Sequence, residues 1–151
     1  MSESTLEVSR NCWLKRIQNI WNSNYNCKFQ CNTGEIYEIE FGENIGDEFS
    51  GLHFGMVLQN SSPSNSKVLV IPISSRIEEY NIKYTLDVES YVEGNRISGG
   101  FVMGEAKWIS KQRILKYSKI FKENPNDEIR AVGFYKAPKW LIHKLANLGG
   151  C

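Results

Sequence analysis

Short apolar segments separated by turn-forming residues fill the middle of this 151-residue chain, and their spacing constrains the fold more than any other feature. The segments HFGMVLQ (53–59) and KVLVIPI (67–73) are separated only by NSSPSNS, whose Ser, Asn and Pro residues are typical of turns. A connection this short joins neighbouring antiparallel strands, because parallel strands require a much longer crossover. The sequence therefore predicts a β-hairpin at this position.

Three further segments have the composition of strands, and they are residues 35–41, 82–88 and 96–106. Helices are predicted in three places, which are residues 5–22, a short stretch after Ser110 within 109–121, and residues 137–150. Strands that follow one another as hairpins form a small, strongly twisted antiparallel sheet or a partly open barrel. We therefore expect a mainly β fold with helices added at both ends.

The length of the chain fits a single domain, 1–151, with its own apolar core. No apolar run approaches the ~20 residues that cross a bilayer, and the start MSESTLEVSR does not resemble a signal peptide, so we expect a cytosolic protein without membrane contact. The four cysteines are then expected to be reduced thiols. Their spacing and that of the two histidines do not match a metal-ligand set, so no metal and no other cofactor is expected.

Charge is distributed unevenly, although the net charge is only +1. Residues 35–60 contain six acidic residues and no Lys or Arg, and we expect Glu38 and Glu40 to lie on a solvated strand face rather than to bind metal ions. Residues 107–144 contain ten Lys or Arg and three Asp or Glu. This excess fits either a solvated helical face or a basic surface that attracts a polyanion such as RNA, and charge alone does not decide between them.

Polar side chains occur where the predicted strands begin or end, and they are His53, Gln59, Ser74, Ser75 and Glu105. The predicted hairpin places the end of the second strand beside the start of the first, where His53 lies. An imidazole near a hydroxyl group suits proton transfer at neutral pH. Spacing alone leaves open whether His53 is catalytic or merely exposed.

The order of these features resembles the MazF/PemK family of toxin endoribonucleases. The family's loop and strand motifs correspond to Gly42, Gly46, Glu48, Gly51 and the pair Gln59-Asn60, followed by a second strand that ends in PISS (72–75). The segment GFVMGEAKWISKQRIL is similar to the family's strand that ends in Glu and continues into a short basic helix. The resemblance divides the chain into an N-terminal extension, 1–33, a barrel core, 34–116, and a C-terminal helical tail, 117–151.

The resemblance implies an SH3-like twisted antiparallel β-barrel, which forms a homodimer and is neutralised by an antitoxin protein. It also implies sequence-selective, metal-independent cleavage of single-stranded RNA, in which the ribose 2′-OH attacks the adjacent phosphate and leaves a 2′,3′-cyclic phosphate and a 5′-OH. His53 stands where the family commonly has a catalytic Arg, and Ser74 stands where it often has Thr. In one interpretation His53 replaces the Arg as acid or base; in the other, the site has lost its cation and binds without cutting.

The first interpretation assigns a role to each residue of the expected site. His53 and Ser74 are the expected catalytic residues. Contacts with RNA are assigned to Phe54, Ser75, Arg76, Lys107 and Trp108, and Phe49 is a further stacking candidate. Supporting roles are assigned to Glu48, Gln59 and Glu105. The alternative is a non-catalytic binding module on the same barrel, which recognises RNA or a protein partner.

Overall fold

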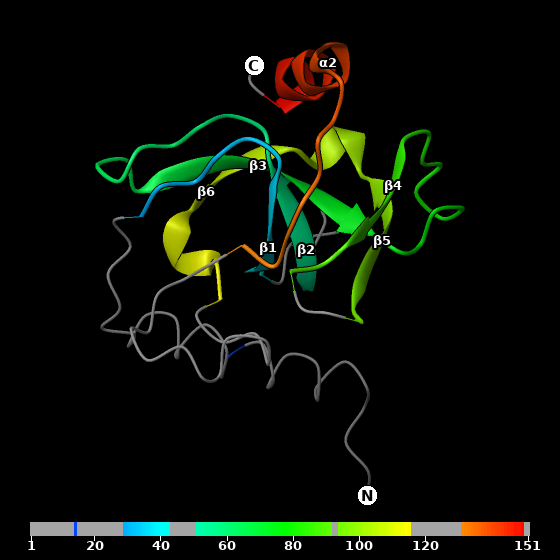
Figure 1. The fold of residues 1–151 in the computed structure, drawn as a ribbon, viewed down its shortest axis with the longest axis horizontal. Coiled ribbons are helices and arrows are strands. Elements are labelled where there is room, and N and C mark those ends of the chain that lie inside the picture. Colours follow the sequence, from blue (N-terminus) through cyan, green and yellow to red (C-terminus); the bar gives the residue numbers. More distant parts are fainter. Residues whose placement is uncertain (1–13, 15–28, 43–50, 92–93, 116–130, 150–151) are drawn as a thin grey trace, which may run out of the picture.

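The computed structural model describes residue 14 and residues 29–42, 51–91, 94–115 and 131–149 (Figure 1). The predicted N-terminal helix, 5–22, lies outside the described residues apart from Leu14. Glu48, Phe49 and three of the four cysteines also lie outside the described residues. Cys31 is described, and it is a buried free thiol.

The described residues form seven strands joined in one antiparallel sheet with the order β4-β5-β3-β2-β1-β7, in which β6 pairs with β3 off this path. The strands are β1 (Glu35–Glu40), β2 (Leu52–Val57), β3 (Lys67–Ser74), β4 (Thr85–Glu89), β5 (Arg96–Phe101), β6 (Lys107–Ser110) and β7 (Gly133–Phe134). Pairing of β2 with β3 confirms the predicted hairpin.

The two ends of this order approach each other, so the sheet is nearly a closed barrel. An isolated bridge joins Ser90, directly after β4, to Gly133 of β7. The amide of Tyr91 also donates to the carbonyl oxygen of Val132 at 3.0 Å. The predicted mainly β barrel fold is thereby confirmed.

Both faces of the central strands are covered by apolar side chains. Along β3, Val68 and Val70 belong to one buried cluster, whereas Leu69 and Ile71 belong to the other, as expected for side chains that alternate along a strand. The helix α2 (Lys139–Gly149) contributes Leu141 and Leu145 to the second cluster, and Figure 1 shows this helix lying over β3. The predicted C-terminal helix is confirmed.

The prediction of a solvated face on residues 35–41 is wrong. Glu40 is fully buried, and its carboxylate accepts a hydrogen bond from the amide of Gly42 at 3.0 Å. Glu38 is partly buried, and this burial raises the pKa of its carboxyl group. Glu40 lies at the end of β1, where it pairs with Leu52 of β2 and where the guanidinium group of Arg113 donates to its carbonyl oxygen at 3.2 Å. These contacts with distant parts of the chain cover a face that the alternation of the segment alone predicts to be exposed.

The prediction of a helix capped by Ser110 is confirmed only as a single 3-10 turn in the described residues. Lys107–Ser110 is strand β6, and Ser110 caps only the single turn η2 (Lys111–Arg113), where its hydroxyl accepts from the amide of Gln112. Lys111 has no exposed surface, and its ammonium group donates to the carbonyl oxygens of Phe29 at 2.7 Å and Ser62 at 2.9 Å. The segment is therefore held in place by contacts between distant parts of the chain.

Candidate functional site

The start of β2 is positioned by a narrow loop base at the end of β1. The amide of Gly51 donates to the carbonyl oxygen of Gly42 at 2.8 Å, and the amide of Phe41 donates to the carbonyl oxygen of Gly51 at 2.9 Å. Both glycines have positive φ, 89° at Gly42 and 90° at Gly51, which side-chain-bearing residues rarely adopt. This base fixes the point at which the chain enters β2 and therefore fixes the position of His53.

The imidazole of His53 lies close to Phe41 and Gly51. The ring centroids of His53 and Phe41 are 6.5 Å apart, and a Cβ atom at Gly51 would lie 3.6 Å from His53 Nε2. The ammonium group of Lys107 lies 5.8 Å from the centroid of the same Phe41 ring. Two of the residues predicted from the sequence, His53 and Lys107, are thus gathered around one aromatic ring.

A pocket of about 270 Å³ opens beside this position. It is lined by Glu38, Leu52, His53, Phe54, Ile73, Ser75 and Ser98. Phe54 pairs with Glu38 on β1 and with Ile73 on β3, so these three side chains share one face of the sheet. His53 pairs with Ile39 on the opposite face, so the pocket extends around the start of β2.

Glu38 and Ser98 are pocket residues that sequence reasoning missed. The pKa of Glu38 is raised by burial, so its carboxyl group holds its proton to a higher pH than an exposed glutamate does. Only the register of β1 against β2 brings Glu38 beside the predicted Phe54, and a segment with alternating glutamates does not reveal that register. Ser98 comes from β5, which reaches the site through its pairing with β3.

The two serines at the end of β3 have different surroundings. Ser74 is buried, and its hydroxyl accepts a hydrogen bond from the amide of Arg76 at 3.1 Å. Continued by one residue, the register that pairs Phe54 with Ile73 would set Ser74 opposite His53. Ser75 is exposed and lines the pocket. The structure therefore places Ser75 in the pocket and Ser74 behind it, on the face that His53 shares.

Besides Ser74, five described residues predicted for the site do not line this pocket, and they are Gln59, Arg76, Glu105, Lys107 and Trp108. Arg76 is exposed and forms an ion pair with Glu79 at 3.6 Å. Trp108 is 45% exposed on β6, and Gln59 is exposed just after β2. Glu105 is partly buried in the single turn η1 (Met103–Glu105).

Within the described part of the chain, no three His, Cys, Asp or Glu side chains are grouped so that they could hold a metal ion. None of the helices in that part is long and apolar enough to cross a membrane.

Comparison with known proteins identifies the family. A family model described as the PemK-like, MazF-like toxin of the type II toxin-antitoxin system matches residues 32–132, about two thirds of the chain. The chain belongs to this toxin family. The match includes every residue predicted for the site, but it ends before α2.

Among solved structures, the chain is similar to the crystal structure of MazF (Form-I) from Deinococcus radiodurans. The two share 14% sequence identity with a TM-score of 0.46, over 81% of this chain and 94% of that one. No curated protein matches the chain.

Proposed function

We propose that this toxin-family protein is a sequence-selective endoribonuclease that cleaves single-stranded RNA without a metal ion. In the proposed reaction the ribose 2′-OH loses its proton as its oxygen attacks the adjacent phosphorus. The bond from phosphorus to the 5′-oxygen breaks, and that oxygen takes up a proton. The products are a 2′,3′-cyclic phosphate and a 5′-OH end.

The observation that carries this proposal is the position of His53, which lines an open pocket and lies near the ring that Lys107 also contacts. An imidazole transfers protons efficiently near neutral pH, as the 2′-OH and the departing 5′-oxygen require. The ammonium group of Lys107 adds positive charge near the position that the phosphate would occupy. Phe54 offers an apolar surface in the same pocket for an adjacent base.

The two serines and Glu38 receive supporting roles in this proposal. Ser75 is the hydroxyl that reaches the pocket, so it is proposed to contact the phosphate or the ribose, while Ser74 holds the end of β3 in place through Arg76. Glu38 is proposed to contact the base next to Phe54. Burial raises the pKa of Glu38 and so favours the neutral carboxyl group over the charged form that would repel an RNA phosphate.

The cellular role that we propose follows from the family. The protein is proposed to act in the cytosol as a homodimer that inhibits growth by cutting mRNA. A cognate antitoxin protein is proposed to bind it and relieve that inhibition.

The second candidate function is a binding module that holds RNA or a protein without cutting. The buried hydroxyl of Ser74 favours this reading, because in this conformation it is already hydrogen-bonded to the chain's own backbone.

One experiment separates the two functions. Long RNAs are incubated in EDTA with the wild type and with the variants His53→Ala, Ser74→Ala and Ser75→Ala, and the 5′-OH ends are mapped by sequencing. The nuclease proposal expects recurrent cleavage sites with the wild type, none with His53→Ala, and a larger loss with Ser75→Ala than with Ser74→Ala. Binding without any new RNA end in the wild type would support the binding module instead.

A further inference from the structure

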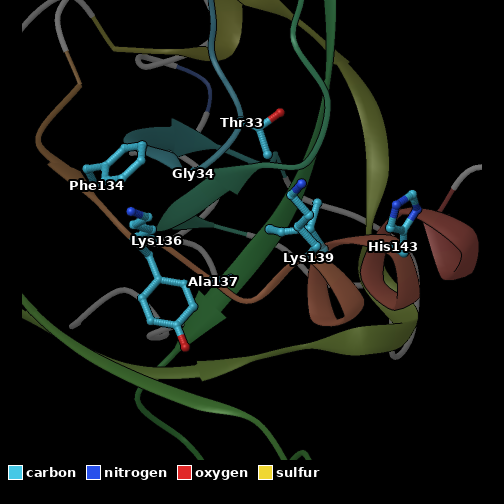
Figure 2. Close-up of a pocket in the computed structure, with 9 residues that line it drawn as sticks. Thr33, Gly34, Phe134, Lys136, Ala137, Lys139 and His143 are labelled. Carbon is cyan, nitrogen blue, oxygen red and sulfur yellow. The ribbon is translucent and has the colours of Figure 1, made fainter.

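A second pocket, of about 250 Å³, lies at the other end of β1 from His53. Thr33 and Gly34, which precede β1, form one side of it. Figure 2 shows Phe134 and Lys136 on the segment that leads toward α2, and Lys139 and His143 on the helix itself. We refer to this pocket as the α2 groove.

The α2 groove is basic. Lys136, Lys139 and His143 line it, and none of its lining residues is acidic. The sequence from residue 131 to the C-terminus contains no Asp or Glu at all. A pocket whose lining carries charge of one sign concentrates ligands of the opposite charge.

The two lysines of the α2 groove differ from other basic residues of the 107–144 region in what they contact. Lys111 is buried against two carbonyl oxygens, and Lys144 donates to the hydroxyl of Tyr84 at 2.9 Å. Lys136 and Lys139 have neither a side-chain hydrogen bond nor an ion pair among the described residues. Their charges are therefore available to a ligand.

The position of Lys139 adds a second argument. It is the first residue of α2, whose first turn contains no acidic residue. A positive charge there is unfavourable, because the unpaired amides at the start of a helix already carry partial positive charge. The stability of α2 alone would favour Asp or Glu at this position. A lysine here is therefore better explained by the binding of a negatively charged ligand.

The wall of the α2 groove is built by a close approach of two backbones. The amide of Tyr135 donates to the carbonyl oxygen of Gly34 at 2.8 Å. A Cβ atom at Gly34 would lie 2.8 Å from the carbonyl oxygen of Tyr135 and 2.9 Å from the ring of Phe134. The Phe134 ring is thereby held beside Lys136 with 41% of its surface exposed.

We propose that the α2 groove is a second contact site for single-stranded RNA, in which Lys136 and Lys139 bind phosphates and Phe134 stacks on a base. The choice of RNA rests on the proposed function. An exposed aromatic ring next to lysines suits nucleic acid better than an acidic peptide, because every base offers a face for stacking whereas carboxylate side chains offer none.

The distance between the two sites fits one continuous strand. Ile39, the pairing partner of His53, lies five positions after Gly34, which corresponds to about 17 Å along the strand. An RNA held in the α2 groove could therefore extend to the pocket at His53. The groove would raise the affinity for long RNAs and leave the chemical step unchanged.

The test measures the binding of a fluorescent 2′-O-methyl RNA of about 16 nucleotides, a length at the upper end of common single-strand sites. This probe lacks the attacking hydroxyl and cannot be cut by the proposed reaction, so the result does not depend on cleavage activity. The double variant Lys136→Glu/Lys139→Glu is compared with Lys67→Glu/Lys83→Glu, which changes the net charge equally at exposed lysines outside the α2 groove.

The proposal expects the groove variant to bind at least about tenfold more weakly than the wild type, and the control to lose much less. The salt dependence should also become shallower in the groove variant, by about 1.4 in the slope of log affinity against log salt for two lost phosphate contacts on a single strand. Phe134→Ala should weaken binding by roughly tenfold with an unchanged salt slope.

Three results would overturn the proposal. In the first, the wild type does not bind the probe. In the second, the groove variant and the control variant lose the same affinity for the probe. In the third, a poly-glutamate peptide binds through the same lysines more tightly than the RNA. Circular dichroism and thermal unfolding check that the variants fold, and Lys139→Glu should fold at least as stably as the wild type. If wild type binds through the α2 groove but cuts no RNA, the nuclease proposal fails and the groove proposal stands.

Discussion

The two ends of β1 carry pockets of similar volume and opposite chemistry. The pocket at His53 contains Glu38, whose pKa is raised by burial, together with three apolar and three polar neighbours. The α2 groove contains three basic side chains and no acidic one. The difference suggests a division of labour, in which one end of the strand performs proton transfer and the other attracts a charged chain.

The two pockets also differ in their relation to the family. The residues of the first pocket all lie within the segment that matches the toxin family. Most of the α2 groove, including both lysines, follows the end of that segment. The first pocket thus lies in the segment shared with the family, although His53 stands where the family commonly has Arg, whereas both lysines of the α2 groove lie beyond the matched segment.

The largest effect is expected at His53. Replacement by Ala should lower the single-turnover rate of RNA cleavage by about 10²–10⁴-fold, the usual contribution of a positioned acid or base. Binding of the 2′-O-methyl probe should change little, since the α2 groove is intact. A His53→Ala variant that cuts at the wild-type rate would remove the imidazole from the mechanism and with it the proposed division.

The second effect concerns the α2 groove during cleavage. Lys136→Glu/Lys139→Glu should raise KM for a long RNA about tenfold and leave kcat within twofold, because the groove is proposed to bind phosphates away from the reacting atoms. Lys67→Glu/Lys83→Glu is the matched control. A fall in kcat with unchanged KM would show that these lysines act in the chemical step, and the comparison between the two pockets would break down.

The third effect is a pH dependence of stability that originates at Glu38. Burial raises the pKa of this carboxyl group, so the folded protein holds the proton to a higher pH than the unfolded chain does. Its contribution to the free energy of unfolding is complete below the ordinary glutamate pKa and is lost as pH rises through the raised value. The variant Glu38→Gln should therefore gain stability relative to the wild type as pH rises from the ordinary glutamate pKa through the raised value, as measured by urea unfolding.

Glu78→Gln, at an exposed turn position outside the pocket, is the control for this measurement. If Glu38→Gln becomes less stable relative to the wild type as pH rises, the carboxylate is stabilised at this site rather than destabilised. The contrast between an acid in one pocket and bases in the other would then need another explanation.

The smallest effect is a gain in stability from Lys139→Glu. Exchange of a positive for a negative charge in the first turn of α2 should raise the free energy of unfolding by about 0.3–1 kcal/mol at low salt. The same variant should bind RNA more weakly. A loss of stability would show that Lys139 supports the helix, and the argument that its position reflects binding would be lost.

The sequence was sufficient for features that depend on neighbouring residues. The turn between 59 and 67 predicted the hairpin that places His53 beside the end of β3, and the terminal helix was visible from its start and stop signals. It was not sufficient where distant segments decide the outcome. Glu40 is buried where the end of β1 meets β2 and Arg113, and residues 107–110 form a strand because β3 offers them an edge.

The candidate sites follow the same rule. His53, Phe54 and Ser75 could be named because they lie at predicted strand ends. Glu38 could not, since its place in the pocket depends on the register between β1 and β2. The α2 groove was beyond prediction, because Gly34 and Lys136 are brought together only by the pairing of β1 with β7.

Because the ammonium group of Lys111 is buried, its reactivity toward an amine reagent depends on whether the surrounding segments are folded. This group ties residues 29, 62 and 111 together and has no exposed surface, whereas Lys136 is open to solvent. Amine-directed acylation of the native protein should modify Lys136 at once and reach Lys111 only when those three segments separate. Mass spectrometry during labelling would thus measure two rates in a single sample: the labelling of an exposed amine at Lys136 and the opening of the three segments at Lys111.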